Sequence, residues 1–269
     1  MTFIEQLSRH WQNGTQVCLG LDPYPERFPA RFADDPDRIL HFNQAIIDAT
    51  ADLVCCFKPQ FAHFAAEAAE AQLQATIAHI KEKHPEVPVI LDAKRGDIGS
   101  TASMYAREAF EHYQADAVTV NPYMGSDTVM PFADHADKGV ILLCRTSNPS
   151  AAEFQNLLLE GEPLYIHVAR RAQQHWNRHG NICLVVGATA PEEMARIRAV
   201  APDLPFLVPG IGAQGGDLEG TVRNGATSPG RGLMINSSRS ILYASQGEDF
   251  AEAARQETLR LKTAINDLA

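Results

Sequence analysis

Short apolar segments alternate with amphipathic segments along the whole chain, and this alternation limits the folds that are possible. Most of the apolar segments are nearly continuous, which suits parallel strands covered on both faces. Eight such strands, alternating with helices, predict one α/β domain over residues 1–269, a (β/α)₈ TIM barrel, because eight strands close such a barrel. A doubly wound open sheet is the alternative. The predicted strands are residues 17–21, 53–58, 87–94, 117–121, 139–144, 182–186, 206–210 and 232–237.

The segments between these strands have the spacing of helices that bury one face. Pro163 and Pro191 suit first-turn positions, where a missing N–H costs nothing. A weakly patterned segment at 146–161 follows the fifth strand, and a loop of this length is more often functional than decorative. The predicted helices are residues 37–50, 65–84, 101–113, 126–136, 163–179, 191–200 and 250–268.

Composition and charge narrow the classes of partner. The net charge is −10 and no basic stripe is present, so neither a nucleic acid nor an anionic membrane is an expected partner. No apolar run reaches the roughly 20 residues that span a bilayer, and the N-terminus lacks the basic region of a signal peptide. The five cysteines show no C-x-x-C spacing, which favours buried free thiols and a cytoplasmic location.

Charged residues collect where the predicted strands end, and the third strand is the most informative. Side chains alternate along a strand, so Asp92 and Lys94 share the face that points into the barrel mouth. Asp97 adds a third charge just beyond Gly96. Neighbouring carboxylates favour the ionised form of a lysine, which makes Lys94 a suitable proton donor to a developing carbanion.

A second lysine strengthens the catalytic interpretation over a purely structural one. Asp92 and Lys94 could be an ion pair that merely closes the barrel. Lys58 ends the second strand at the same rim, and four alternating charges would be costly to bury for stability alone. The chain shows no G-x-S-x-G elbow and no P-loop. His175 and His179 have a metal-chelating spacing, but their polar surroundings favour a solvated helix face.

Glycines and an arginine after the last two strands predict an anion site. Gly215 and Gly216 lie in a glycine-rich segment after the seventh strand, and Arg239 follows the eighth strand. Many barrels bind phosphate at this position, through backbone N–H groups and a forked guanidinium.

Several of these motifs together resemble one family. The segment Leu91-Asp-Ala-Lys-Arg-Gly-Asp-Ile-Gly-Ser-Thr is similar to the signature of orotidine 5′-phosphate decarboxylases of the longer bacterial type, often called type 2. Further similarity lies in Leu19-Gly-Leu-Asp-Pro, Phe57-Lys-Pro, Val120-Asn-Pro-Tyr-Met-Gly-Ser-Asp and Pro209-Gly-Ile-Gly-Ala-Gln-Gly-Gly, so the resemblance covers essentially the whole chain.

The resemblance implies conversion of orotidine 5′-monophosphate to uridine 5′-monophosphate and carbon dioxide, with no metal or organic cofactor. It makes Lys94 the proton donor to C6, places Asp92 beside the leaving carboxylate, and adds Lys58 and Asp97 to the charged network. It also implies a homodimer in which Asp97, with Thr101 near it, reaches the neighbouring site. The remaining implied ligands are Asp22 for the ribose, Ser147 for the pyrimidine, Gln214 for the base and phosphate, and Gly215, Gly216 and Arg239 for the phosphate.

Two rival functions share part of the pattern. A metal-dependent aldolase or decarboxylase of a sugar phosphate can carry the same D-x-K-x-x-D element, but it needs an acidic residue placed for magnesium near the strand ends. A ligand-binding barrel without catalytic activity would not require Lys58 and Lys94 together.

Overall fold

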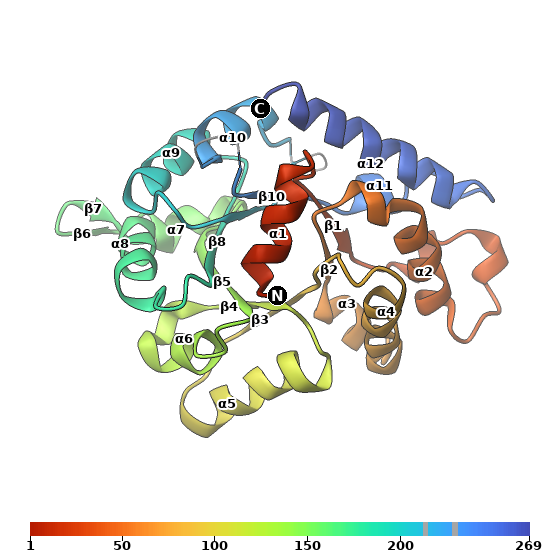
Figure 1. Cartoon of the computed structure of the whole chain (residues 1–269), viewed down its shortest axis with the longest axis horizontal. Coiled ribbons are helices and arrows are strands. Elements are labelled where there is room, and N and C mark those ends of the chain that lie inside the picture. The colour runs from red at the N-terminus through yellow and green to blue at the C-terminus, as the bar shows by residue number, and fades with distance from the viewer. Residues whose placement is uncertain (212–214, 228–230) are drawn as a thin grey trace.

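Eight parallel strands form a closed barrel in the computed structural model, which describes residues 1–211, 215–227 and 231–269 (Figure 1). Their order is β2-β1-β10-β9-β8-β5-β4-β3. Bridges from Phe57 to Val89 and from Gln60 to Asp92 join β2 to β3, so the predicted barrel is confirmed and the open sheet is excluded. The strands are β1 Val17–Leu21, β2 Cys56–Pro59, β3 Ile90–Arg95, β4 Ala117–Val120, β5 Gly139–Arg145, β8 Ile182–Val186, β9 Phe206–Val208 and β10 Leu233–Ser237.

Helices surround the barrel and bury their apolar faces against it (Figure 1). The predicted helix at 65–84 is wrong as one element: it is two helices, separated where Ala68 has a φ of 51°. The predicted helices at 101–113 and 163–179 begin as α-helix and end in π-helical turns. The helices are α2 Arg38–Thr50, α3 Phe61–Ala66, α4 Glu70–Lys83, α5 Gly99–Arg107, α6 Ser126–Ala133, α8 Leu164–Arg171, α9 Pro191–Val200, α10 Leu218–Gly225, α11 Arg239–Leu242 and α12 Phe250–Asn266.

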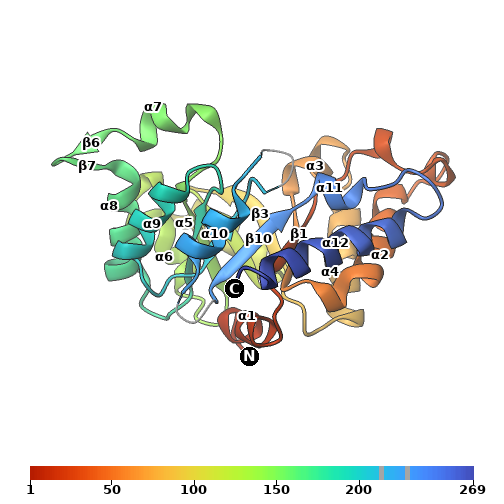
Figure 2. The same ribbon diagram turned by 90° about the horizontal axis from the view of Figure 1, so that it is seen from above.

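An N-terminal helix, α1 Phe3–Gln12, closes one end of the barrel (Figures 1 and 2). Thr2 and Glu5 form a capping box at its start. Leu7 and Trp11 face the strand beginnings, and the Trp11 indole donates a hydrogen bond to the Leu233 carbonyl at 2.8 Å. The helix therefore fills the end of the barrel at which the strands begin.

The interior of the barrel next to α1, where the strands begin, is packed with small and medium-sized side chains. Cys18, Cys56 and Cys183 lie there with Leu207 and Met234, in one cluster with α1. All five cysteines are buried and free, as the sequence predicts. Burial raises the pKa of the Cys183 thiol, as expected for a side chain that acts as an apolar group. The packed interior leaves the opposite end of the barrel for a site.

The segment after β5 has more structure than its weak pattern predicts. It forms a 3₁₀ turn, the short helix α7 Ala152–Gln155 and a hairpin of β6 Leu158–Leu159 with β7 Glu162–Pro163. Pro163 is the N-cap of α8, one position before the predicted first turn, whereas Pro191 does begin α9. Figure 2 shows α7 and the hairpin at the end of the barrel opposite α1.

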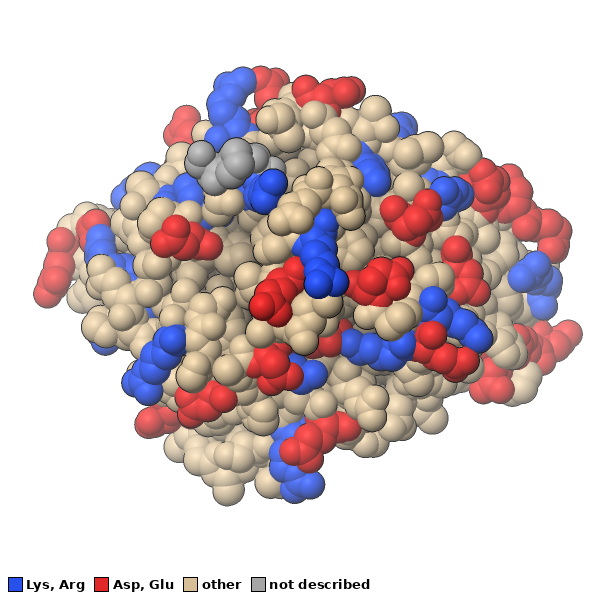
Figure 3. Space-filling model, viewed as in Figure 1, with Lys and Arg blue, Asp and Glu red and all other residues tan. Residues whose placement is uncertain are grey.

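Two further observations concern surface charge and helix hydropathy. Basic and acidic side chains are interspersed over the face seen in Figure 3, without a continuous basic stripe. In the described part of the chain, no helix is both long enough and apolar enough to cross a membrane.

Candidate active site

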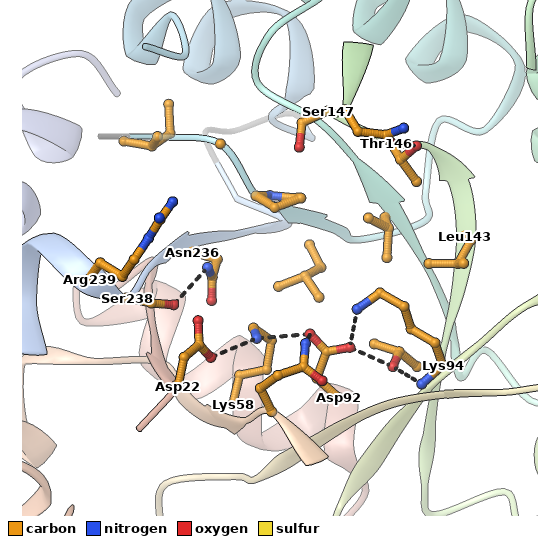
Figure 4. Close-up of a pocket in the computed structure, with 18 of the residues that line it drawn as sticks. Asp22, Lys58, Asp92, Lys94, Leu143, Thr146, Ser147, Asn236, Ser238 and Arg239 are labelled. Carbon is orange, nitrogen blue, oxygen red and sulfur yellow. Dashed lines mark hydrogen bonds and ion pairs between the residues drawn. The ribbon is translucent and has the colours of Figure 1, made fainter. Parts of the chain in front are cut away.

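A cavity of about 560 Å³ opens at the carboxyl ends of the strands, on the side of the barrel away from α1. Figure 4 shows Asp22, Lys58, Asp92 and Lys94 in a row along one side of it, with Ser147 and Arg239 farther away. These six residues come from β1, β2, β3, β5 and β10 or from the segments that directly follow them. The alternation of side chains along a strand and the closure of the barrel thus bring distant segments to one rim.

Asp92 is the centre of the charged row and accepts four hydrogen bonds. Lys58 Nζ lies 2.9 Å from Asp92 Oδ2, and Lys94 Nζ lies 2.7 Å from Oδ1. The Gln60 amide donates to Oδ2 at 3.0 Å, and the Thr119 hydroxyl donates to Oδ1 at 2.9 Å. Because each oxygen has one ammonium and one neutral donor, the carboxylate is fixed in a single orientation.

Burial and charge act in opposite directions on this carboxylate and on its buried lysine. Burial alone would raise the pKa of Asp92, but the charges of Lys58 and Lys94 outweigh it and hold that pKa well below its usual range. Burial alone would lower the pKa of Lys58, which is 4% exposed, but Asp92 and Asp22 hold it well above its usual range. Both groups are therefore ionised at neutral pH.

The backbone of β3 departs from regular geometry at Lys94. Leu91 pairs with Val118 and Arg95 pairs with Val120, so β3 contains two more residues than β4 over this stretch. Lys94 has a φ of 45°, which is unfavourable for a residue other than glycine. Its N–H donates to the Thr119 hydroxyl at 2.9 Å instead of a strand carbonyl. This bulge re-aims the ammonium group of Lys94, whose side chain is 47% exposed, toward the cavity.

We expect Thr119→Val to reduce turnover, because the Thr119 hydroxyl joins the Lys94 backbone to the Asp92 carboxylate. The variant leaves the Lys94 N–H without its partner and removes one of the two donors to Asp92 Oδ1, a loss of about 1–3 kcal/mol in the free energy of unfolding. We expect kcat to fall about tenfold with a smaller change in KM, since 1.4 kcal/mol corresponds to tenfold in rate. Urea unfolding and steady-state kinetics check both effects. Thr119→Ser, which keeps the hydroxyl, should behave nearly as wild type; equal losses in the two variants would contradict this role.

Polar groups on the other side of the cavity come from the segment after β5, from β10 and from the residues that follow β10. Ser147 lies against Gly187, where an added Cβ would come within 2.8 Å of the serine Cβ. Gln155 in α7 accepts from the Thr146 N–H and donates to its hydroxyl, at 2.9 and 2.8 Å, so α7 is fastened to the segment that carries Ser147. Arg239 is exposed and has no salt bridge within the described residues. This side thus offers a cation and hydroxyl groups to a polar ligand.

Some of the predicted site residues do not line this cavity. Asp97 accepts a hydrogen bond from the N–H of Ile98, and Thr101 is exposed on α5. The N–H of Gly216 donates to the Gly210 carbonyl at 3.0 Å, and the neighbouring Gly215 has a φ of 69°. Gln214 lies outside the described residues.

Two residues at the centre of the charged row were not predicted from the sequence. Gln60 is two positions after Lys58, so strand alternation could have indicated it. Thr119 could not be recognised, because its contact depends on the bulge in β3. Arg95, which follows Lys94, does not line the cavity: it pairs with Glu108 at 2.8 Å and its guanidinium lies over the Phe61 ring.

A closed barrel with a lysine–aspartate–lysine centre at its strand ends defines a TIM-barrel enzyme. Residues 15–256 match the sequence profile of the family described as orotidine 5′-phosphate decarboxylase / HUMPS. The chain belongs to this family.

Individual relatives support the assignment over the full length of the chain. The chain is 63% identical to orotidine 5′-phosphate decarboxylase of Dechloromonas aromatica, with 99% of each chain covered. Among solved structures it is similar to the OMP decarboxylase of Leishmania donovani, with a TM-score of 0.85 and 38% identity over 100% of both chains. It also matches UMP synthase of the same organism, with a TM-score of 0.89 and 39% identity, and covers 56% of that longer chain.

Proposed function

We propose that the protein decarboxylates orotidine 5′-monophosphate to uridine 5′-monophosphate in pyrimidine biosynthesis, with Lys94 as the proton donor to C6. The observation that carries this proposal is the cavity in which Asp92 lies between Lys58 and Lys94, with Arg239 farther away (Figure 4). The 63% identity to a relative named as this decarboxylase supports the choice of substrate.

The reaction needs a fixed cation beside the ring carbon that loses its carboxylate. When the bond from C6 to the carboxylate breaks, its electron pair remains on C6 and carbon dioxide leaves. The Lys94 ammonium stabilises the developing charge and then transfers a proton to C6. Asp92 holds Lys94 in place at 2.7 Å, and the buried Lys58 keeps Asp92 ionised. The apolar side chains of Leu143, Val185 and Leu207 also line the cavity and suit carbon dioxide, the uncharged product.

The cavity is less suited to a metal-dependent reaction on a sugar phosphate. Asp22 and Asp92 are its carboxylates among the described residues, and both lie next to Lys58 Nζ, at 3.8 and 2.9 Å. The lysine ammonium therefore occupies the position at which a magnesium ion would bridge two carboxylates.

Loss of the ultraviolet absorbance of orotidine 5′-monophosphate in the presence of EDTA tests the proposed reaction. We expect turnover that is unchanged by EDTA and that is far slower with orotidine, which lacks the phosphate for Arg239 to bind. Absence of turnover with orotidine 5′-monophosphate would refute the proposed function, and turnover that stops with EDTA would favour the metal-dependent alternative.

The position of Asp97 outside its own cavity supports a homodimer with shared sites. Three large apolar residues are exposed close to Asp97 or on the elements beside it. They are Ile98, Met104 in α5 and Tyr123 just after β4, with exposures of 52%, 53% and 74%. In such a dimer, a second copy of the chain would cover these apolar residues and bury Thr101. Asp97 of each subunit would then approach the charged row in the cavity of the other subunit. The family resemblance implies the same arrangement.

We expect two inactive variants, Lys94→Ala and Asp97→Ala, to regain activity when they are mixed and allowed to exchange subunits. Half of the dimers are then mixed, and one of their two sites has both residues intact, so about a quarter of wild-type activity should return. Each variant alone, carried through the same exchange, is the control. No recovery in dimers shown to have exchanged would contradict a shared site.

A further inference from the structure

Two outer helices carry a second cluster of chemically active side chains, away from the cavity. Asp48 lies near the end of α2, His79 lies in the last turns of α4, and His84 is the C-cap of α4. The ligand-capable atoms of these three residues all lie within 4.8 Å of one another. The helices end where the next strands begin, so the cluster is at the end of the barrel opposite the cavity.

Both imidazoles present the same nitrogen to the same oxygen atom. His79 Nε2 lies 2.7 Å from Asp48 Oδ1, and His84 Nε2 lies 3.0 Å from it. Ligands around a tetrahedral zinc ion are about 3.3 Å apart, given bonds of about 2.0 Å. The two histidine–aspartate distances are a few tenths of an ångström shorter than this, and the ligand atoms of all three residues lie within 4.8 Å, so small side-chain rotations can place them around an ion.

The surroundings hold the imidazole of His79 in place. Its Nδ1 lies 3.4 Å from Gln44 Nε2, and rotation of that amide would let the amide oxygen accept from Nδ1–H and leave Nε2 for an ion. The side chains of His79 and His84 are 12% and 21% exposed, whereas that of Asp48 is 54% exposed. The nitrogens are thus largely withdrawn from water while the carboxylate side stays open for an ion to enter.

We propose that Asp48, His79 and His84 form a binding site for a divalent transition-metal ion of the zinc class, which clamps α2 to α4. Two imidazoles and one carboxylate are the donors that such ions prefer, and water completes the coordination shell. The site is structural and separate from the proposed decarboxylation, since it lies at the other end of the barrel.

Calorimetric titration with Zn²⁺ tests the site, using protein that has no polyhistidine tag and from which EDTA has removed bound metal. We expect one equivalent to bind with micromolar or tighter affinity. His79→Gln and His84→Gln should each weaken binding at least about tenfold, because each removes one of three ligands. His175→Gln is the matched control, since that histidine is outside the cluster, and it should bind as wild type does. The cysteines do not compete, because all five are buried.

Two further measurements separate a metal site from a hydrogen-bonded cluster. Zn²⁺ should raise the Tm of the wild type by several degrees and that of both histidine variants much less, because an ion stabilises the folded state according to its affinity for it. Co²⁺ should give a visible absorption band that depends on both histidines. Turnover of orotidine 5′-monophosphate should stay the same with and without Zn²⁺. Absence of binding to the wild type, or binding in both variants as tight as in the wild type, would overturn the proposal.

Discussion

Replacement of Lys94 by alanine is expected to abolish turnover while leaving nucleotide binding and folding nearly intact. The variant loses the cation that stabilises charge at C6 and the proton that C6 receives, so kcat should fall by at least about 10³-fold. Stability should change little, because the Lys94 side chain is 47% exposed and Asp92 keeps its contact with Lys58. Stopped-flow absorbance gives the rate, and calorimetry with uridine 5′-monophosphate gives the affinity.

Lys94→Arg separates the two roles of the lysine. Arginine retains the positive charge, but its guanidinium does not release a proton at neutral pH. If proton transfer is essential, this variant should be nearly as slow as Lys94→Ala; if the charge alone suffices, much of the rate should return. A Lys94→Ala protein that binds nucleotide and keeps wild-type turnover would contradict the proposed mechanism altogether.

The barrel could be predicted because its signal is repeated eight times. Each strand is a short apolar run with a helix after it, and β1, β8 and α9 have the predicted bounds. The errors lie where tertiary contacts override local pattern. α1 has a capping box and an apolar face, but its place across the barrel end depends on strands far along the chain. The break in the helix at 65–84 depends on Ala68, which has no breaker side chain.

The charged centre of the site could be inferred from strand alternation, whereas its supporting contacts could not. Asp92 faces the cavity as a period of two requires, and Lys58 joins it because β2 and β3 are neighbours in the barrel. Lys94 lines the same cavity, but the bulge in β3 directs its ammonium there. Thr119 contacts the Lys94 backbone because of the bulge in β3, and no local sequence pattern predicts that bulge. The histidine cluster was missed for a similar reason. A spacing of five residues does not place two side chains on one helix face, and His84 reaches His79 because it leaves the helix at the C-cap.

Replacement of Asp92 by asparagine should damage both catalysis and stability, since this carboxylate balances two lysines. Removal of one partner from a buried ion pair costs about 3–5 kcal/mol in the free energy of unfolding. Among the described residues, Lys58, which is 4% exposed, then retains Asp22 at 3.8 Å as its one counter-charge. Turnover should also collapse, because Lys94 loses the contact that positions it. Asp116→Asn is the matched control: it breaks another buried pair, with Lys81, but lies outside the cavity and should destabilise the fold while preserving turnover of the folded protein.

The pH dependence of the stability lost in Asp92→Asn tests whether that loss is electrostatic. In the wild type the pKa of Asp92 is lowered and that of Lys58 is raised, so both contributions to stability are complete between the unfolded-state values of about 3.9 and 10.4. In Asp92→Asn, we expect burial to outweigh the remaining attraction of Asp22 and to lower the pKa of Lys58. The unfolded variant then binds more protons than the folded one, so its stability should rise with pH. Urea unfolding should therefore show a smaller difference from wild type at pH 9 than at pH 7, and a constant or growing difference would show that the loss is not due to the buried lysine charge.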